Sequence, residues 1–397
     1  MSANPSGEAR VSVADRIGLI RSTLVPFPAA AGGVHRDRFG RLVERYGADA
    51  VFGYLRRRRI THAALVSHGD HPAVADDSGP FWLFRQAGSA IREVHRRELP
   101  RLAAAFAARG VPLIAFKGLM LDLALGNTDA PTLGGDIDLL VQRDTLPAAR
   151  DVMASLGYEV DLRVESGRVR RMPARLTRLT EGSIYSYGQC QPYDRLVAVP
   201  ELDPLADRVR ALLPANFCLL DGRLQLKLSV DLHYSLNLLA DDAGLRVKPG
   251  EDAWWAAPRT VPVDGTPVRT LGDEVLPWVL LHRLYVDAMV LQETTIKTLC
   301  HLKLLHAYGR LDVGHVRAAA RRYPYLAPSL HYALRAADQL CELGLDRTGL
   351  AEPAELRAAH APTMNVGDCL PTLLDLGVGF ELADSGGDDA ELTVRVG

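Results

Sequence analysis

The sequence predicts an α+β protein in which a small mixed β-sheet is flanked by N-terminal and C-terminal helical regions. The first observation is an apolar spacing of three and four residues through most of the first hundred positions, which is typical of amphipathic helices. The second is a set of short apolar or alternating runs between residues 111 and 233, which is typical of strands. The third is a return of the helical spacing between residues 270 and 341.

The N-terminal region, residues 1–85, is expected to be helical after a disordered start at residues 1–10. Residues 11–66 carry the helical pattern, which ends in a turn-rich loop. A second helical stretch covers residues 81–109 and contains Pro100. Because proline lacks the N–H that a helix interior requires, we expect Pro100 to kink this helix or to split it in two.

The central region, residues 86–240, is expected to hold the β-sheet. In chain order its elements are strand 111–116, helix 119–126, strand 136–142, helix 145–156, a strand near residue 160 and strand 226–233. Residues 161–222 are predicted to form an elaborated hairpin or flap inserted before the last of these strands. Arginines in this flap either bind an anionic ligand or face the solvent; they are Arg163, Arg168, Arg170, Arg171, Arg175 and Arg178.

The C-terminal region, residues 241–397, is expected to be mainly helical with an acidic tail. Residues 254–269 resemble a short β excursion. Thr270, with an acid three positions later, has the pattern of a helix N-cap. Helices are then expected as far as Cys341, and residues 384–389 form an acidic turn of low complexity.

The composition excludes several classes of protein. The formal net charge of −2 gives no general attraction for long nucleic acids, so a polyanion site has to be a local patch. No apolar stretch approaches the roughly 18 residues that a bilayer-spanning helix needs, and the N-terminus lacks the apolar segment of a signal peptide. The lack of such a stretch also predicts no membrane partner. The five cysteines are scattered and form no C-x-x-C pair, so we expect reduced cysteines in a cytoplasmic protein.

Two carboxylates lie two residues apart in the apolar run from Gly134 to Val141. In an extended strand, Asp136 and Asp138 point to the same face. Two like charges on a buried strand are costly unless a cation neutralises them. A divalent ion that also contacts phosphate oxygens is the usual occupant of such a pair. The alternative is a strand end with two solvated aspartates.

Two further segments carry polar groups at the ends of predicted strands. In the run from Leu226 to His233, alternation places Asp231 and His233 on one face, opposite the apolar positions. Upstream, the strand at residues 111–116 is followed by a Lys117-Gly118 turn and a helix. Glycine allows backbone N–H groups to approach a phosphate at a helix N-terminus. The alternatives are a structural histidine and a lysine that simply extends into water.

Together these motifs resemble the uncharacterised nucleotidyltransferase family of the polymerase-β-like nucleotidyltransferase superfamily. The matching segments are Phe116-Lys117-Gly118, Gly135-Asp136-Ile137-Asp138-Leu139-Leu140-Val141 and Val230-Asp231-Leu232-His233-Tyr234. The resemblance is good over residues 100–240. Two positions depart from the wider superfamily: Leu119 follows the glycine where a small residue is common, and Thr132 stands where relatives often carry an arginine.

The resemblance implies a metal-dependent enzyme that transfers NMP from an NTP to a hydroxyl or similar acceptor. The three carboxylates would be both the catalytic residues and the metal ligands: Asp136, Asp138 and Asp231. Mg²⁺, with two ions, is the expected cofactor because these ligands are all oxygen. The residues expected to bind the nucleotide are Lys117, Gly118 and His233.

Three classes of function remain open at this point, and the third is a metal enzyme that cleaves phosphodiester bonds with the same acids. The first is the transferase, whose acceptor is a small molecule such as a specialised metabolite, a protein hydroxyl or an RNA end. The second is a non-catalytic NTP-binding or partner-binding protein on a degenerate nucleotidyltransferase fold. The departures at Leu119 and Thr132 favour the second class, whereas the presence of all three acids favours the first.

Overall fold

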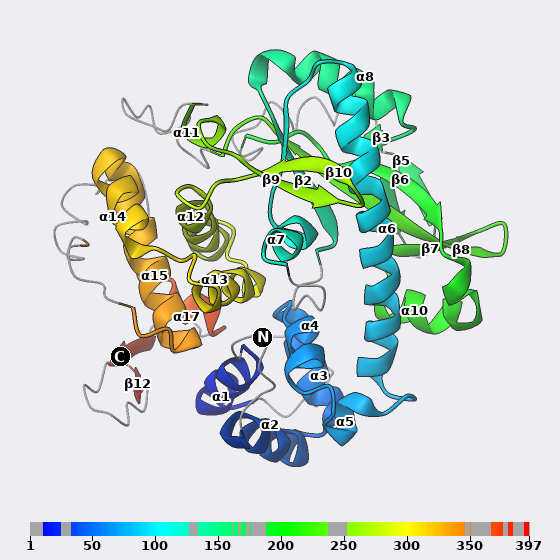
Figure 1. Cartoon of the computed structure of the whole chain (residues 1–397). Coiled ribbons are helices and arrows are strands. Elements are labelled where there is room, and N and C mark those ends of the chain that lie inside the picture. The colour runs from blue at the N-terminus through cyan, green and yellow to red at the C-terminus, as the bar shows by residue number, and fades with distance from the viewer. Residues whose placement is uncertain are drawn as a thin grey trace. The chain divides into compact units, whose positions relative to one another are not determined.

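The computed structural model describes residues 11–24, 33–126, 134–160, 162–165, 168–171, 175, 188–236, 252–345, 350, 367–375, 380–383 and 393–396. It confirms the predicted α+β class, because a small mixed sheet and many helices are present (Figure 1). The expected disordered start at residues 1–10, Thr132 and the acidic turn at residues 384–389 lie outside the described residues.

The chain divides into two compact units. The helical unit combines Met1–Phe81 with Pro277–Gly397, and the sheet unit is Trp82–Leu276. This grouping differs from the three ranges expected from the sequence, since helices from both ends of the chain belong to one unit. The sequence-based domain boundaries stay a prediction.

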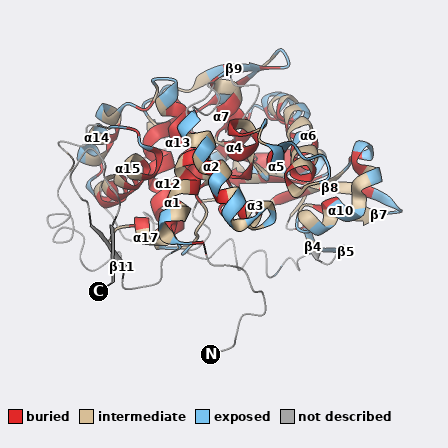
Figure 2. Cartoon of the chain, turned by 90° about the horizontal axis from the view of Figure 1, so that it is seen from below, coloured by how far each residue is buried: buried red, intermediate tan, exposed pale blue. Residues whose placement is uncertain are grey.

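The helical unit is built largely from short and medium helices. Those before the sheet unit are α1 (Val13–Thr23), α2 (Gly33–Tyr46), α3 (Ala48–Arg57), α4 (Thr61–Ser67) and α5 (Pro72–Ala75). Those after it are α12 (Leu276–Met289), α13 (Lys297–Ala307), α14 (Val313–Arg322), η4 (Pro324–Leu326), α15 (Ala327–Cys341) and α17 (Leu370–Leu373), with strands β11 (Phe380–Ala383) and β12 (Thr393–Val396). Helices α12, α13 and α15 are largely buried, whereas α2 exposes much of its surface (Figure 2). The prediction of helices as far as Cys341 is confirmed.

Among the described residues, no helix is both long enough and apolar enough to cross a bilayer. The longest, α6 (Pro80–Ala108), has 29 residues, and it carries charged side chains along its length.

The sheet unit is organised around a six-stranded mixed sheet. Its strands are β1 (Leu113–Ala115), β2 (Asp136–Val141), β3 (Glu159–Val160), β6 (Tyr193–Ala198), β7 (Phe217–Leu220) and β8 (Arg223–His233). The order is β1-β2-β8-β6-β3, and β7 also pairs with β8. Within this sheet β2 and β8 run parallel, and the other described pairs are antiparallel. The long strand β8 is therefore the central strand of the sheet, since it pairs with β2, β6 and β7.

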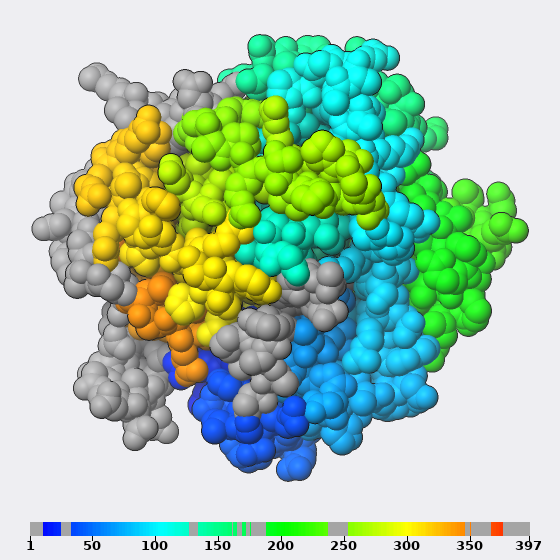
Figure 3. Space-filling model, viewed as in Figure 1, coloured from blue at the N-terminus to red at the C-terminus, as the bar shows by residue number. Residues whose placement is uncertain are grey.

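The remaining elements of the sheet unit cover or extend this sheet. They are α6, α7 (Gly118–Ala124), η1 (Arg143–Thr145), α8 (Leu146–Ser155), η3 (Pro200–Leu205), α10 (Ala206–Leu212), α11 (Asp252–Trp255) and the hairpins β4 (Leu162–Glu165) with β5 (Arg168–Arg171) and β9 (Arg259–Val263) with β10 (Thr266–Thr270). Apolar side chains from α6, α7, α8 and the strands form one buried core. The β9–β10 hairpin packs on β1 and α7, and Figure 3 shows it, in yellow-green, on the surface above α7.

Helix α6 is continuous through Pro100, so of the two alternatives expected from the sequence, a kink or a split, the split is wrong. Leu99, Leu102 and Phe106 on either side of this proline are buried in the core of the sheet unit. Their burial stabilises the helical conformation against the loss of one backbone hydrogen bond.

The range predicted as a flap, residues 161–222, contains two strands of the central sheet, which corrects that prediction. The β4–β5 segment is a hairpin, as expected. However, β6 pairs with β8 over six residue pairs, and β7 pairs with β8 over four. Arg195 and Asp194 interrupt the apolar pattern of β6, which explains why the periodicity did not reveal this strand.

Thr270 does not cap a helix, which corrects a further expectation. It is the last residue of β10 and pairs with Arg259, and α12 begins six residues later at Leu276. A turn at Gly272 separates the two elements. A Cβ at position 272 would lie 2.3 Å from the carbonyl oxygen of Ala257, so only glycine fits there.

A buried carboxylate ties α6 to the far edge of the sheet. Glu98 is almost fully buried, and its Oε1 accepts hydrogen bonds from the Tyr158 hydroxyl and from Arg101, both at 2.8 Å. Its Oε2 accepts a hydrogen bond from Arg195 of β6 at 2.7 Å. Burial raises the pKa of Tyr158, and the neighbouring Glu98 carboxylate raises it further.

We expect Glu98→Ala to lower the free energy of unfolding by about 3–5 kcal/mol, because the substitution leaves buried partners without their carboxylate. Glu93→Ala is the control, since Glu93 lies on the same helix and pairs with Arg96 and Arg97 at the surface. A much smaller change is expected there. Urea denaturation measures both, and equal effects would contradict the structural role assigned to Glu98.

Candidate active site

The parallel pairing of β2 with β8 brings the predicted acids side by side. Asp136 lies opposite Ser229, Asp138 lies opposite Asp231, and Leu140 lies opposite His233. Residues directly opposite each other on paired strands share a face. The strand register thus agrees with the predicted placement of Asp231 and His233 on one face, and it shows that Asp136 and Asp138 lie on the same face of the neighbouring strand. We call this face of the sheet the site face.

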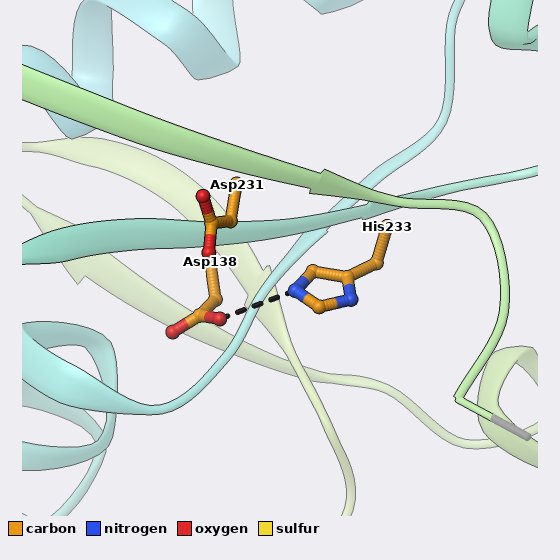
Figure 4. Close-up of side chains that lie close together, drawn as sticks. All are labelled: Asp138, Asp231 and His233. Atoms are coloured by element: carbon orange, nitrogen blue, oxygen red, sulfur yellow. Dashed lines mark hydrogen bonds and ion pairs between the residues drawn. The ribbon is translucent and has the colours of Figure 1, made fainter. Parts of the chain in front are cut away.

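Asp138 is the centre of the group. Its side chain is buried, and its Oδ1 accepts a hydrogen bond from Lys117 Nζ at 2.6 Å. His233 Nε2 lies 3.2 Å from the same oxygen (Figure 4). One carboxylate oxygen thus faces a lysine and a histidine, while Asp231 stands beside it. His233 is also buried, and its ring packs edge-on against Phe116, with ring centroids 5.2 Å apart.

The Lys117-Gly118 turn has an unusual backbone. Lys117 has φ 64° and ψ −175°, a region that is essentially restricted to glycine, and Gly118 follows with φ 47°. The turn also approaches the start of β2 closely, because a Cβ on Gly118 would lie 3.8 Å from the carbonyl oxygen of Asp136. A Cβ on Gly134 would lie 3.2 Å from that same oxygen. The side chain of Lys117 is held at Asp138 at the cost of local strain, which is typical of functional sites.

Ligand atoms of Asp138, Asp231 and His233 all lie within 4.8 Å of one another, which is close enough for one metal ion to contact all three. Two carboxylates and an imidazole fit a divalent cation. This donor set differs from the three carboxylates expected from the sequence, because it includes His233 and not Asp136. Imidazole also accepts transition metals, so the set alone does not select Mg²⁺.

Asp136 lies at the start of β2 and is half-buried. Burial lowers the pKa of His95, a residue of α6, to about 4. The negative charge of Asp136 acts on His95 in the opposite direction, but its effect is smaller. His95 is thus neutral at physiological pH. The role of Asp136 as a metal ligand stays a prediction.

Sequence reasoning missed Asp194, which lies on β6 opposite Ser229. Asp194 is 1% exposed, and the Ser229 hydroxyl donates a hydrogen bond to its Oδ1 at 2.5 Å. Lys227 Nζ lies 3.6 Å from the same oxygen. The signal was present in the alternation of β8, which placed Lys227 and Ser229 on the same face as Asp231. Asp194 itself lay in the range predicted as a flap.

Residues 61–342 match the uncharacterised nucleotidyltransferase family, and the chain belongs to that family. No curated protein matches it.

Two solved structures are similar to this chain. One is the antibiotic-resistance factor ANT(2'')-Ia, at 16% identity over 61% of this chain and 96% of that chain, with a TM-score of 0.30. The other is an antigenic nucleotidyltransferase-like protein from Paracoccidioides brasiliensis, at 10% identity over 59% of this chain and 91% of that chain, with a TM-score of 0.26.

Proposed function

We propose that this protein is a metal-dependent enzyme that transfers NMP from an NTP to a hydroxyl or similar acceptor. The observation that carries the proposal is the grouping of Asp138, Asp231 and His233 next to the Lys117-Gly118 turn, in a chain of a nucleotidyltransferase family. The acceptor is a small molecule, a protein hydroxyl or an RNA end. The net charge of −2 makes a long nucleic acid the least favoured of these.

Asp138 and Asp231 are the two carboxylates that would take part directly in the proposed transfer reaction. Together with His233 they would hold Mg²⁺, which offsets the negative charge on a bound triphosphate. Asp231 would accept the proton of the acceptor hydroxyl. The acceptor oxygen then forms a bond to the α-phosphorus, the bond from the α-phosphorus to the bridging oxygen breaks, and pyrophosphate leaves.

Lys117, Gly118 and Asp136 would serve the nucleotide side of the site. The Lys117 ammonium is a compact charge on a flexible stem, and it would exchange its contact with Asp138 for one with a β- or γ-phosphate oxygen. Gly118, which has φ 47°, would let backbone N–H groups of the turn approach a phosphate. We retain Asp136 as a ligand of a second Mg²⁺ ion on the triphosphate side.

The second candidate is a non-catalytic NTP-binding protein on the same fold. The direct contact of Lys117 with Asp138 favours it, because a lysine can neutralise this carboxylate without a metal. All five cysteines are free and buried, which fits the expected cytoplasmic location of either candidate.

Thermal unfolding with ATP, GTP, CTP or UTP, with and without Mg²⁺, tests ligand binding. We expect stabilisation that requires both metal and one or more NTPs, and that EDTA abolishes. Transfer of label from an α-phosphate-labelled NTP into a cell extract tests catalysis. Metal-dependent binding without any transfer would support the non-catalytic candidate, and the absence of both would contradict each of them.

We expect Lys117→Ala and Lys117→Gly to weaken NTP affinity equally, by about 10-fold to 100-fold, because both remove a charge-assisted hydrogen bond worth about 1.5–3 kcal/mol. The two variants should differ in stability. Glycine accommodates the backbone at position 117, whereas alanine keeps its strain, so Lys117→Gly should be more stable by about 1 kcal/mol. The Michaelis constants for NTP and the urea midpoints measure these effects. An unchanged Michaelis constant in both variants would show that Lys117 does not contact the triphosphate.

A further inference from the structure

The ammonium group of Lys117 lies beside Asp138, where a metal cation would bind. Its Nζ donates a hydrogen bond to Asp138 Oδ1 at 2.6 Å, and the exposed fractions of the two side chains are 17% and 7%. A direct lysine contact balances the charge of a carboxylate, and salt screens such a half-buried pair only weakly. The negative charge that would attract a divalent cation to Asp138 is therefore already compensated by the protein itself.

Two further features hold the ammonium group in this position. Lys117 Nζ lies 4.9 Å from the centroid of the Phe116 ring, a distance at which an aromatic face attracts a cation. The Phe116 ring is buried and packs edge-on against His233. The backbone of Lys117 has a conformation that is rare outside glycine, and such conformations persist only where the surrounding contacts fix them. The lysine thus has a defined position, unlike a surface lysine that samples many rotamers.

A divalent cation and the Lys117 ammonium compete for this site. The ligand atoms of Asp138, Asp231 and His233 lie within 4.8 Å of one another, so an ion held by all three would lie close to Lys117 Nζ. His233 approaches the same oxygen of Asp138 that the lysine contacts (Figure 4). Positive charges at such short range repel each other, and more strongly away from bulk water. Binding of the ion therefore requires the lysine to move away.

A bound triphosphate gives the lysine a new partner. The β- and γ-phosphates carry more negative charge than one carboxylate, and an ammonium on a flexible stem can turn from one to the other. In the proposed function Lys117 binds these phosphates. Its movement restores the full charge of Asp138 beside Asp231, and two neighbouring carboxylates favour a cation. Nucleotide and cation then bind cooperatively, and each raises the affinity for the other by the same factor.

We infer that the contact between Lys117 and Asp138 is autoinhibitory: it keeps free divalent cations out of the site, so that the protein takes up the cation together with a triphosphate. The inference rests on the proposed function and adds a binding order to it. It also gives Lys117 a second role besides phosphate binding. Without nucleotide, the contact protects the site from transition-metal ions, for which the imidazole of His233 is a suitable ligand.

The test measures the binding of Mn²⁺ to the full chain without nucleotide. Lys117→Met keeps the length of the side chain and removes its charge. The control Lys227→Met makes the same change on the same face of β8, where Lys227 Nζ lies 3.6 Å from Asp194, which is outside the group of possible metal ligands. Electron paramagnetic resonance of the free ion gives the Kd of each protein, and urea denaturation shows whether each variant is folded.

We expect Lys117→Met to bind Mn²⁺ about 10-fold more tightly than wild type or more, and Lys227→Met to bind it as wild type does. Thermal unfolding with the α,β-methylene analogues of the four NTPs, which cannot release pyrophosphate, gives the nucleotide side. Wild type should be stabilised by Mn²⁺ and analogue together, whereas Mn²⁺ alone should stabilise Lys117→Met. A gain in metal affinity combined with a loss in nucleotide affinity distinguishes an autoinhibitory lysine from one that only binds phosphate.

Two results would overturn the inference. Equal Mn²⁺ affinity in wild type and Lys117→Met would show that the ammonium does not hinder the ion, and an equal gain in both variants would show that only net charge matters. Either result leaves the proposed function standing if Mn²⁺ and analogue together stabilise wild type. If they do not, and no label is transferred, the proposed function fails and the inference fails with it. Should Lys117→Met not fold, Lys117→Gly takes its place, because glycine accommodates the backbone at this position.

Discussion

Asp138→Asn is expected to lower nucleotidyl transfer by about 10³-fold or more and to remove the stabilisation that Mg²⁺ and NTP together give. Asp138 is the residue of the site whose carboxylate oxygen contacts both Lys117 and His233. Asparagine has nearly the same shape, so the fold should persist, but the side chain no longer carries the charge that holds a cation. Initial rates with α-labelled NTP and thermal unfolding measure the two effects.

The matched control is Asp144→Asn, which makes the same change at an exposed aspartate in η1, just after β2. It should leave transfer and ligand stabilisation unchanged. If Asp138→Asn kept full activity, the metal site would have to be placed elsewhere. If Asp138→Asn unfolded the protein, urea denaturation would reveal it, and the loss of activity would then reflect a structural role.

Asp231→Ala is expected to separate binding from catalysis. Asp138 and His233 remain to hold the cation, so stabilisation by Mg²⁺ and NTP should be largely retained. The rate constant of transfer should fall by about 10² or more, which is the usual scale for removing a positioned base. Measuring the Michaelis constant for NTP together with kcat distinguishes the two effects.

Asp207→Ala is the control for this substitution, because Asp207 lies on α10 of the same unit and its side chain is 93% exposed. It should change neither quantity. Equal losses of NTP binding and turnover in Asp231→Ala would mean that Asp231 holds the triphosphate side of the site. No loss of either would remove Asp231 from the mechanism.

The strand-based part of the site could be predicted from the sequence. Strict alternation in β8 and the two-residue spacing of Asp136 and Asp138 in β2 indicated which side chains share a face, and the structure brings Asp138, Asp231 and His233 together. These strands have apolar residues at the alternate positions, so their period is clear. The parallel pairing of β2 with β8 was not predicted, because periodicity carries no information on which strands are neighbours or on their direction.

The contacts that depend on tertiary packing could not be predicted. Lys117 was expected to reach a phosphate, but its contact with Asp138 depends on a backbone conformation that is rare for lysine. Asp194 was missed because it lies in a strand whose apolar pattern is broken by charged residues. Those charges are tolerated inside the protein because each finds a partner, as Arg195 does in Glu98, and such pairing is invisible to periodicity.

The parallel pairing of β2 with β8 also has a consequence for how the chain reaches its native state. Asp138 and His233 are 95 residues apart in the sequence, and β6, which flanks β8, is made from the chain between them. Contacts of such large sequence separation form slowly, because loop-closure entropy is lost before they contribute stability. We therefore expect the cation site proposed here to form late in the folding of the sheet unit. During refolding, the recovery of metal affinity should lag behind the recovery of helical signal, so a nascent or partly folded chain has no competent site.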